Sequence, residues 1–206
     1  MAFHKHPAGK AFYMADYPLD ALFFFDFDGV LADQDEEKLF QLEEMELERG
    51  RLEDMARYHG INPDLYPSTG YLRHLVYQAE VFDFPIKPHD EAVEFARNLD
   101  DFGCPYFIVT ARSGFSAVGR MLRFTERWRL TPHETFCLGR SCKADLLAKL
   151  RKDWPDRPFV FFEDSQRHID AAKALNDPLL TIIQIEWPSC TKSAEDLRRE
   201  YLGAGK

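Results

Sequence analysis

Acidic residues at two separate places in the chain could carry out chemistry. Asp26 and Asp28 come at the end of an apolar run rich in phenylalanine, and Gly29 then breaks its regularity. Glu163 and Asp164 follow a second such run. A buried carboxylate is costly unless a positive or hydrogen-bonding group meets it. Acids at the ends of two buried strands therefore indicate a metal or phosphate site. A tight turn at the first pair and a helix cap at the second are the alternatives.

Three further residues follow predicted strands and could bind an anion. Thr110 ends the apolar segment 106–110, Arg112 comes two residues later, and Lys143 lies in the loop after a short predicted strand. Each has a purely structural alternative. Thr110 suits a strand because it is β-branched, Lys143 could be a solvated surface lysine, and Arg112 could be a surface arginine at the start of a helix.

The pattern of apolar segments predicts an α/β fold with a doubly wound parallel sheet. We expect strands at 21–27, 106–110, 135–138, 159–162 and 181–185, and helices at 33–58, 68–82, 88–103, 116–128, 144–154, 169–175 and 194–202. Residues 1–20 are interpreted as an irregular surface leader. Strands that alternate with helices build a parallel sheet covered on both faces. Such sheets hold ligands at the carboxyl ends of their strands, where the candidate residues lie.

The chain carries an insertion between its first two predicted strands. Residues 28 and 106 are separated by far more than the roughly 30 residues of a βαβ unit. We therefore predict a core of residues 1–32 and 88–206 and a small helical cap at 33–87. An insertion at this point would lie over the open ends of the strands as a lid.

Composition excludes several classes of protein. The chain has 206 residues, 45% of them hydrophobic, and a net charge of −9. We therefore expect one sizeable domain, or one domain with a small appendage, and no nucleic-acid partner. Neither a signal peptide nor a membrane span is expected. The four cysteines form no Cys-x-x-Cys pair, which is typical of reduced thiols. The predicted location is cytoplasmic.

The candidate residues, taken together, resemble the four motifs of the haloacid dehalogenase-like (HAD) superfamily in their order. Asp26-Phe-Asp28-Gly-Val, Thr110 after a strand, Lys143, and Glu163-Asp164-Ser carry the resemblance. It covers residues 22–175 and implies a Rossmannoid three-layer α/β sandwich, often with a cap at the place of the insertion.

The resemblance implies a role for each residue. Asp26 would be the nucleophile that forms an aspartyl-phosphate, and Asp28 the general acid and base. Thr110, Ala111, Arg112 and Lys143 would hold the phosphoryl oxygens. The metal ligands would be Asp26, Asp28 through its backbone carbonyl, Glu163 and Asp164, an oxygen set suited to Mg²⁺.

Charge balance supports the cation. Asp26, Glu163 and Asp164 would meet a phosphate dianion, and like charges 4 Å apart repel by about 4 kcal/mol per pair at an effective dielectric of about 20. Lys143 alone cannot offset this repulsion, so a divalent cation is expected.

The resemblance favours a phosphatase that acts on a small phosphorylated metabolite. Asp28 argues against a dehalogenase, because a departing halide needs no proton. A phosphomutase or phosphotransferase, or a catalytically inactive binding module, remains as an alternative. A weaker similarity of residues 109–168 to HAD-type cytosolic 5′-nucleotidases makes a nucleoside monophosphate one candidate substrate. In that stretch His168 could touch a ligand, or be a helix-surface residue. The natural substrate and the oligomeric state are left open.

Overall fold

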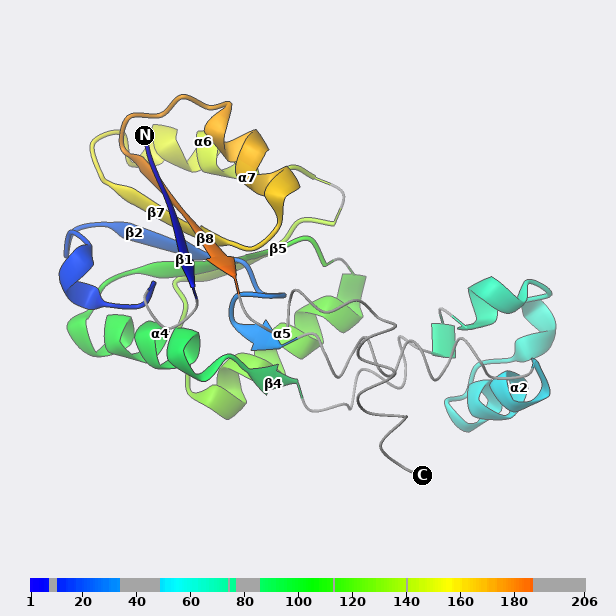
Figure 1. The fold of residues 1–206 in the computed structure, drawn as a ribbon. Helices are drawn as coiled ribbons and strands as arrows, with labels where there is room; N and C mark the ends of the chain where they lie inside the picture. The colour runs from blue at the N-terminus through cyan, green and yellow to red at the C-terminus, as the bar shows by residue number, and fades with distance from the viewer. Residues whose placement is uncertain are drawn as a thin grey trace. The chain divides into compact units, whose positions relative to one another are not determined.

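The molecule consists of two compact units, which we describe separately. The computed structural model describes residues 1–7, 11–33, 49–73, 75–76, 86–112, 114–139 and 141–186 (Figure 1). The first unit contains Met1–Asp33 and Lys87–Thr191, and the second contains Gln34–Ile86 and Lys192–Lys206. All of the candidate site residues belong to the first unit. The assignment of residues 33–87 as a cap stays a prediction.

A six-stranded sheet forms the centre of the first unit. Its strands are β1 (Ala2–Pro7), β2 (Leu22–Phe25), β5 (Tyr106–Thr110), β6 (Glu134–Cys137), β7 (Phe159–Glu163) and β8 (Leu180–Glu186). Their order is β1-β8-β7-β2-β5-β6, and every neighbouring pair is parallel. The predicted parallel sheet is therefore confirmed, with β2 between β7 and β5.

Helices cover both faces of this sheet. One face carries α4 (Asp90–Phe102) and α5 (Gly114–Trp128), and the other carries α6 (Lys143–Asp153) and α7 (Gln166–Lys173) (Figure 1). Helix α4 ends at Gly103, whose φ of 66° is left-handed and whose N–H donates to the carbonyls of Leu99 and Asp100. Glycine adopts this conformation without steric cost. The three layers predicted from the sequence are thus present.

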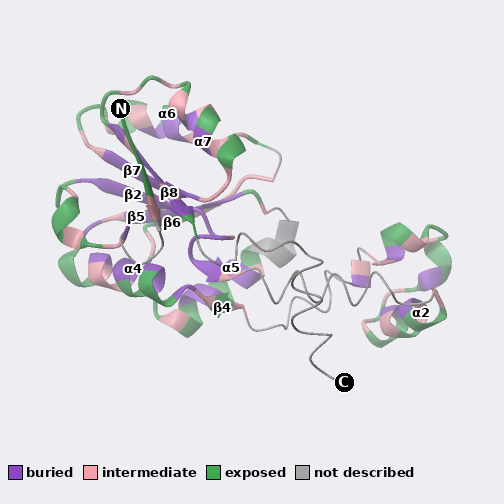
Figure 2. Cartoon of the chain, in the orientation of Figure 1, coloured by how far each residue is buried: buried purple, intermediate pink, exposed green. Residues whose placement is uncertain are grey.

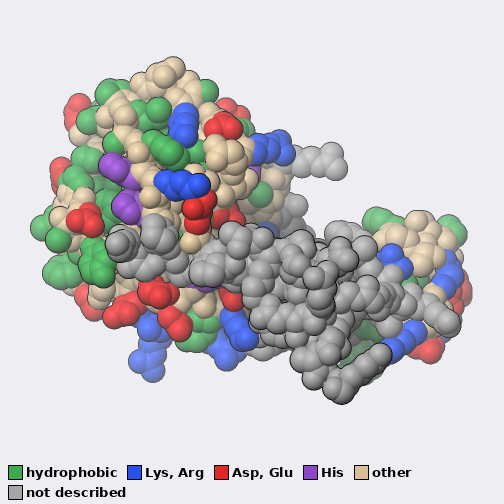
Figure 3. Space-filling view, in the orientation of Figure 1, with side chains coloured by type: hydrophobic (Ala, Val, Ile, Leu, Met, Phe, Trp, Pro, Cys, Tyr) green, Lys and Arg blue, Asp and Glu red, His purple; other side chains and the backbone are tan. Residues whose placement is uncertain are grey.

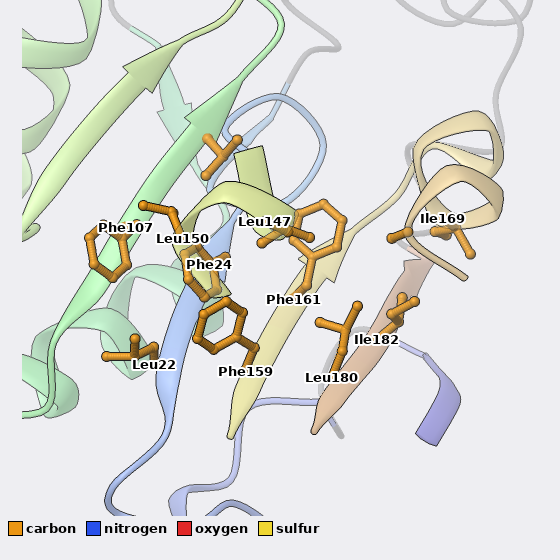
Figure 4. Close-up of a cluster of buried hydrophobic side chains, with 12 residues drawn as sticks. Leu22, Phe24, Phe107, Leu147, Leu150, Phe159, Phe161, Ile169, Leu180 and Ile182 are labelled. Carbon is orange, nitrogen blue, oxygen red and sulfur yellow. The ribbon is translucent and has the colours of Figure 1, made fainter. Parts of the chain in front are cut away.

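The phenylalanines of β2 supply the core on both faces because successive side chains of a strand point in opposite directions. Leu22 and Phe24 belong to one buried cluster with Leu147 and Leu150 of α6 and with Phe159 and Phe161 of β7 (Figure 4). The Phe24 ring lies 4.9 Å from Phe107 and 4.8 Å from Phe159, centroid to centroid.

The opposite face of β2 packs on α4. Phe23 and Phe25 contact Phe95 of α4, with ring centroids 5.8 and 6.1 Å apart, and Phe162 stacks on Phe25 at 4.8 Å. The strands at the centre of the sheet are buried along their length, and exposed residues lie on the outer sides of the helices (Figure 2). A strand buried on both faces holds the residue after it, Asp26, firmly in place.

The N-terminal leader differs from the prediction. Residues 2–7 form the edge strand β1, parallel to β8, and Met14–Asp16 form a 3₁₀ turn, η2. The strand is mostly exposed and carries His4, Lys5 and His6. Its sequence therefore lacks the alternation of apolar residues from which a strand is predicted. Backbone hydrogen bonding to β8 determines its conformation, and Lys5 pairs with Glu186 at 2.6 Å.

The ends of the insertion are paired, which was also not predicted. Strand β3 (Ala32–Asp33) is antiparallel to β4 (Lys87–Pro88). The prediction that a helix begins at residue 33 was therefore wrong at this position. Similarly, α4 begins at Asp90 rather than at Pro88.

The second unit has its own small core. It contains α2 (Arg49–Tyr58), η3 (Pro63–Leu65) and helical residues at 69–73 and 75–76. Leu52, Ala56, Leu72 and Val76 are buried together. Ser68 Oγ accepts a hydrogen bond from Tyr71 N at 3.4 Å, as expected of a helix N-cap. The remainder of the predicted helices 33–58 and 68–82, and the predicted helix 194–202, lie outside the described residues.

The described residues include no membrane-spanning helix, and one face of the molecule carries charges of both signs. No helix among them is both long and apolar enough to cross a bilayer. On the face drawn in Figure 3, acidic and basic side chains of the described residues are interspersed. This face offers no basic patch of the kind that binds nucleic acid.

Candidate active site

The carboxyl edge of the sheet brings the predicted residues to one place. Asp26 directly follows β2, Thr110 ends β5, and Glu163 ends β7. Phe25 is in register with Ile108 on one side and Phe162 on the other. The N–H of Asp26 donates to the carbonyl of Phe162 at 3.0 Å. Parallel pairing therefore places the ends of these three strands side by side.

Lys143 is buried between two of the carboxylates. Its Nζ lies 2.7 Å from Asp26 Oδ2 and 2.7 Å from Glu163 Oε2, and its side chain is 1% exposed. It is the first residue of α6, which carries it back toward the strand ends. The alternative of a solvated surface lysine is therefore wrong. Glu163 Oε1 accepts from Ser165 N at 3.0 Å, so both oxygens of this carboxylate have partners.

Asp164 completes an acidic cluster. Carboxylate oxygens of Asp26, Glu163 and Asp164 lie within 4.8 Å of one another. A Cβ added to Gly29, which has a φ of 78°, would come within 2.1 Å of Asp164 Oδ2. The carboxylate of Asp164 thus packs directly on the loop that follows β2. Ser165, and neither acid, is the N-cap residue of α7.

The pKa shifts of these groups reflect first their burial and then an excess of negative charge. Burial raises the pKa of Asp164 to about 6, and the neighbouring Asp26 contributes in the same direction. Burial and Asp26 also raise the pKa of Glu163. Burial alone would lower the pKa of Lys143, but Asp26 and Glu163 outweigh it and the net shift is upward. One ammonium therefore does not neutralise three carboxylates, and the cluster favours a further cation.

Asp28 points to a different partner. Its Oδ2 accepts from Arg112 Nε at 2.7 Å, and its Oδ1 accepts from Arg112 Nη2 at 2.7 Å. The two side chains are 20% and 18% exposed, respectively. This ion pair joins the loop after β2 to the loop after β5. Of the predicted metal ligands, only Asp28 has its carboxylate outside the acidic cluster, and its backbone carbonyl stays a predicted ligand.

The two remaining predicted residues surround this pair. Thr110 is fully buried, and its Oγ1 accepts from Arg112 N at 3.1 Å. Ala111 is exposed. Both lie beside Arg112 at the carboxyl end of β5.

Sequence reasoning left His168 undecided, and the structure places it near the site. It lies in the first turn of α7 and is half-buried. Burial lowers the pKa of His168, Lys143 lowers it further, and Asp26 opposes the shift. In the sequence, the only indication of a role for His168 was that it follows Glu163-Asp164 by a few residues, in the next predicted helix.

Comparisons with known proteins agree with this geometry. The profile of the 5′-nucleotidase family matches residues 20–179. Human cytosolic 5′-nucleotidase 1B is 36% identical over 74 residues, which are 35% of this chain and 11% of the human protein. The chain therefore covers only a small part of that relative.

Solved structures share the fold. A haloacid dehalogenase-like hydrolase from Burkholderia xenovorans LB400 has a TM-score of 0.56 at 19% identity, covering 81% of this chain and 84% of its own. CbbY from Rhodobacter sphaeroides, determined in complex with phosphate, has a TM-score of 0.54 at 16% identity, covering 84% and 89%.

The fold is that of the HAD-like α/β structures, and the candidate site lies at the carboxyl edge of its sheet. The residues matched by the 5′-nucleotidase family profile, 20–179, make up most of the chain. The chain belongs to the 5′-nucleotidase family.

Proposed function

We propose that this protein is a Mg²⁺-dependent phosphomonoester hydrolase that acts through an aspartyl-phosphate on Asp26. The observation that carries the proposal is the buried Lys143 held between Asp26 and Glu163 in a cluster that still has excess negative charge. Such a site suits a cation and a phosphoryl group together, because positive charge must balance both the carboxylates and the substrate.

The residues of this chain divide the reaction into two steps. In the first, a carboxylate oxygen of Asp26 attacks phosphorus while Asp28, in its acid form, gives its proton to the departing oxygen of the ester. In the second, Asp28 takes a proton from water, the water oxygen bonds to phosphorus, and the bond to Asp26 breaks. Lys143, Thr110 and Arg112 would hold the phosphoryl oxygens during both steps.

The acidic cluster fits Mg²⁺ by its chemistry. Its donors are carboxylate oxygens, the ligand type this ion prefers. Burial and, to a smaller extent, the neighbouring Asp26 raise the pKa of Asp164, and a cation bound there would favour its charged form. Asp26 and Asp164 would hold the ion, with Glu163 nearby and already bonded to Lys143. Bound there, Mg²⁺ would neutralise charge that develops on the transferring phosphoryl group.

Membership of the 5′-nucleotidase family supports a small phosphorylated metabolite as substrate, with nucleoside monophosphates as the first class to assay. The name of the human relative supports a cytosolic location. We therefore propose that the protein acts in the cytoplasm on a small phosphorylated molecule.

Release of phosphate tests the proposal directly. Hydrolysis of p-nitrophenyl phosphate and of nucleoside 5′-monophosphates is measured with Mg²⁺, after EDTA, and with Asp26→Asn. With Mg²⁺ we expect turnover by the wild-type protein, and none after EDTA or by Asp26→Asn. Label from the substrate should remain on the wild-type protein after acid quenching. Asp156→Asn, an exposed residue before β7 at the far end of that strand, is the matched control. Turnover by Asp26→Asn, or turnover undiminished by EDTA, would reject the mechanism.

A further inference from the structure

Two histidines lie on the edge strand β1, outside the candidate active site. His4 and His6 alternate with Lys5 along this strand, and β8 separates it from β7. We propose that the histidine pair is a second metal site, which takes one divalent transition-metal ion such as Zn²⁺. The inference is independent of the proposed phosphatase activity, because it uses none of the residues of the acidic cluster.

The two imidazoles project from the same face of the sheet. Side chains two residues apart on a strand point the same way, and those one residue apart point to opposite faces. The rings of His4 and His6 have centroids 5.9 Å apart and planes inclined by 30°. Two nitrogens that share a tetrahedral Zn²⁺ at about 2.0–2.1 Å lie about 3.3 Å apart, which corresponds to ring centres about 5 Å apart. Rotation about the side-chain bonds can therefore bring both rings to one ion while the backbone stays in place.

Pairing with β8 holds the backbone of both residues. His4 is in register with Ile183 and His6 with Ile185, and both isoleucines are buried. Because the strand is ordered in this way, the second imidazole is already close when the first has bound the ion. Two ligands linked like this bind more tightly than either of them alone.

Both rings are accessible to an ion from solvent. His4 is exposed and His6 is half-buried, and neither ring forms a hydrogen bond with another of the described residues. Lys5, which lies between them in the sequence, points to the other face and pairs with Glu186 at 2.6 Å. The positive charge nearest to the pair along the strand is therefore already balanced.

The type of ligand selects the ion. Neutral imidazole suits Zn²⁺ and related transition-metal ions, whereas Mg²⁺ prefers oxygen. Within the described ranges of the chain, the acidic cluster is the only group of three or more potential protein ligands whose atoms lie within 4.8 Å of one another. The histidine pair thus supplies two ligands, and water would complete the coordination. Such a site exchanges its ion with solvent, unlike a closed structural zinc site.

Zn²⁺ binding to the full chain tests the proposal. Calorimetric titration in excess Mg²⁺, at a pH where imidazole is neutral, measures Zn²⁺ binding by the wild-type protein, His4→Gln and His6→Gln. We expect each substitution to weaken binding at this site about 10²-fold, because only one of two linked ligands remains. Zn²⁺ that binds at the acidic cluster is still bound by both variants and is counted separately. His133→Gln, which removes an exposed histidine beside β6, is the control and should bind as the wild type does.

A double variant tests the part played by the strand. Lys5→His combined with His6→Gln keeps two histidines in the same segment but directs them to opposite faces. We expect this variant to bind Zn²⁺ as weakly as His6→Gln does. Binding as tight as that of the wild type would mean that the strand does not bring the ligands together, and the proposal would be overturned.

Nuclear magnetic resonance of the wild-type protein gives a readout that does not depend on the stability of a variant. Zn²⁺ should shift the ring signals of His4 and His6 together, and each signal is assigned by its absence from the spectrum of the corresponding variant. An unchanged Kd in both single variants, or shifts confined to other histidines, would also overturn the proposal. Thermal unfolding in EDTA identifies a variant that has lost its fold, and the shifts in the wild-type spectrum are then decisive.

Discussion

Lys143 Nζ lies 2.7 Å from Asp26 Oδ2, although one residue begins a helix late in the chain and the other follows the first buried strand at the centre of the sheet. Their side chains are 1% and 8% exposed. At this burial the pair is both a structural contact and a part of the candidate site. Removing Lys143 leaves Asp26 and Glu163 buried without their shared ammonium, and this has measurable consequences.

Replacement of Lys143 by methionine should destabilise the protein. Asp26 and Glu163 would both remain buried without their ammonium, and breaking a buried pair in this way costs about 3–5 kcal/mol. Urea unfolding in EDTA measures the change in free energy. Lys149→Met, on the exposed side of the same helix, is the control and should change stability by less than about 0.5 kcal/mol. Equal stability of the two variants would contradict the buried pair.

Gly29→Ala should abolish Mg²⁺-dependent activity. The new Cβ would come within 2.1 Å of Asp164 Oδ2, so the carboxylate would have to move away from Asp26 and Glu163. A left-handed φ also costs about 1–2 kcal/mol for a residue with a side chain. Gly103→Ala separates these effects, because Gly103 has a similar φ of 66° with nothing within 4 Å. We expect Gly103→Ala to lower the melting temperature and retain kcat/KM, and a similar loss of activity in both variants would refute the steric explanation.

Mg²⁺ should stabilise the wild-type protein and not Asp164→Asn. Binding to the folded state alone contributes about 2.7 kcal/mol when the ion is present at 100 times its Kd. Asp164 belongs to the acidic cluster, whereas Asp170, exposed on α7, does not. Melting temperatures are compared with and without Mg²⁺ for wild type, Asp164→Asn and Asp170→Asn. Retention of the full Mg²⁺ effect in Asp164→Asn would place the ion elsewhere.

Stability should fall in mild acid because of His89. This residue caps the start of α4 and is 7% exposed. Burial lowers its pKa from 6.5 to about 4, against the opposing influence of Asp33, Glu91 and Asp90. The unfolded chain therefore binds a proton that the folded chain does not, and stability decreases as the pH falls from about 6.5 to about 4, by up to about 3 kcal/mol. The stability of His89→Gln should decline less over this interval, and parallel curves for the two proteins would rule out this residue as the cause.

The sequence alone was sufficient to predict the parallel sheet and the positions of its central strands. Runs such as residues 22–25 and 159–162 can be buried on both faces only in such a sheet. Helix α4 and its glycine end were also predictable, since a left-handed residue after a helix favours glycine. The edge strand β1 was not, because its exposed residues show no apolar alternation and it is defined by hydrogen bonds to β8.

The candidate residues were found from their types and their places after predicted strands, and this much the chain itself determined. Tertiary structure alone decided how they are paired: Lys143 with Asp26 and Glu163, and Asp28 with Arg112 rather than with the acidic cluster. Position along the chain tells which strand end a side chain occupies, but its partner depends on the order of the strands and on the direction of each side chain at the edge of the sheet. Those directions arise only when the strands pair in register and the helices pack on them.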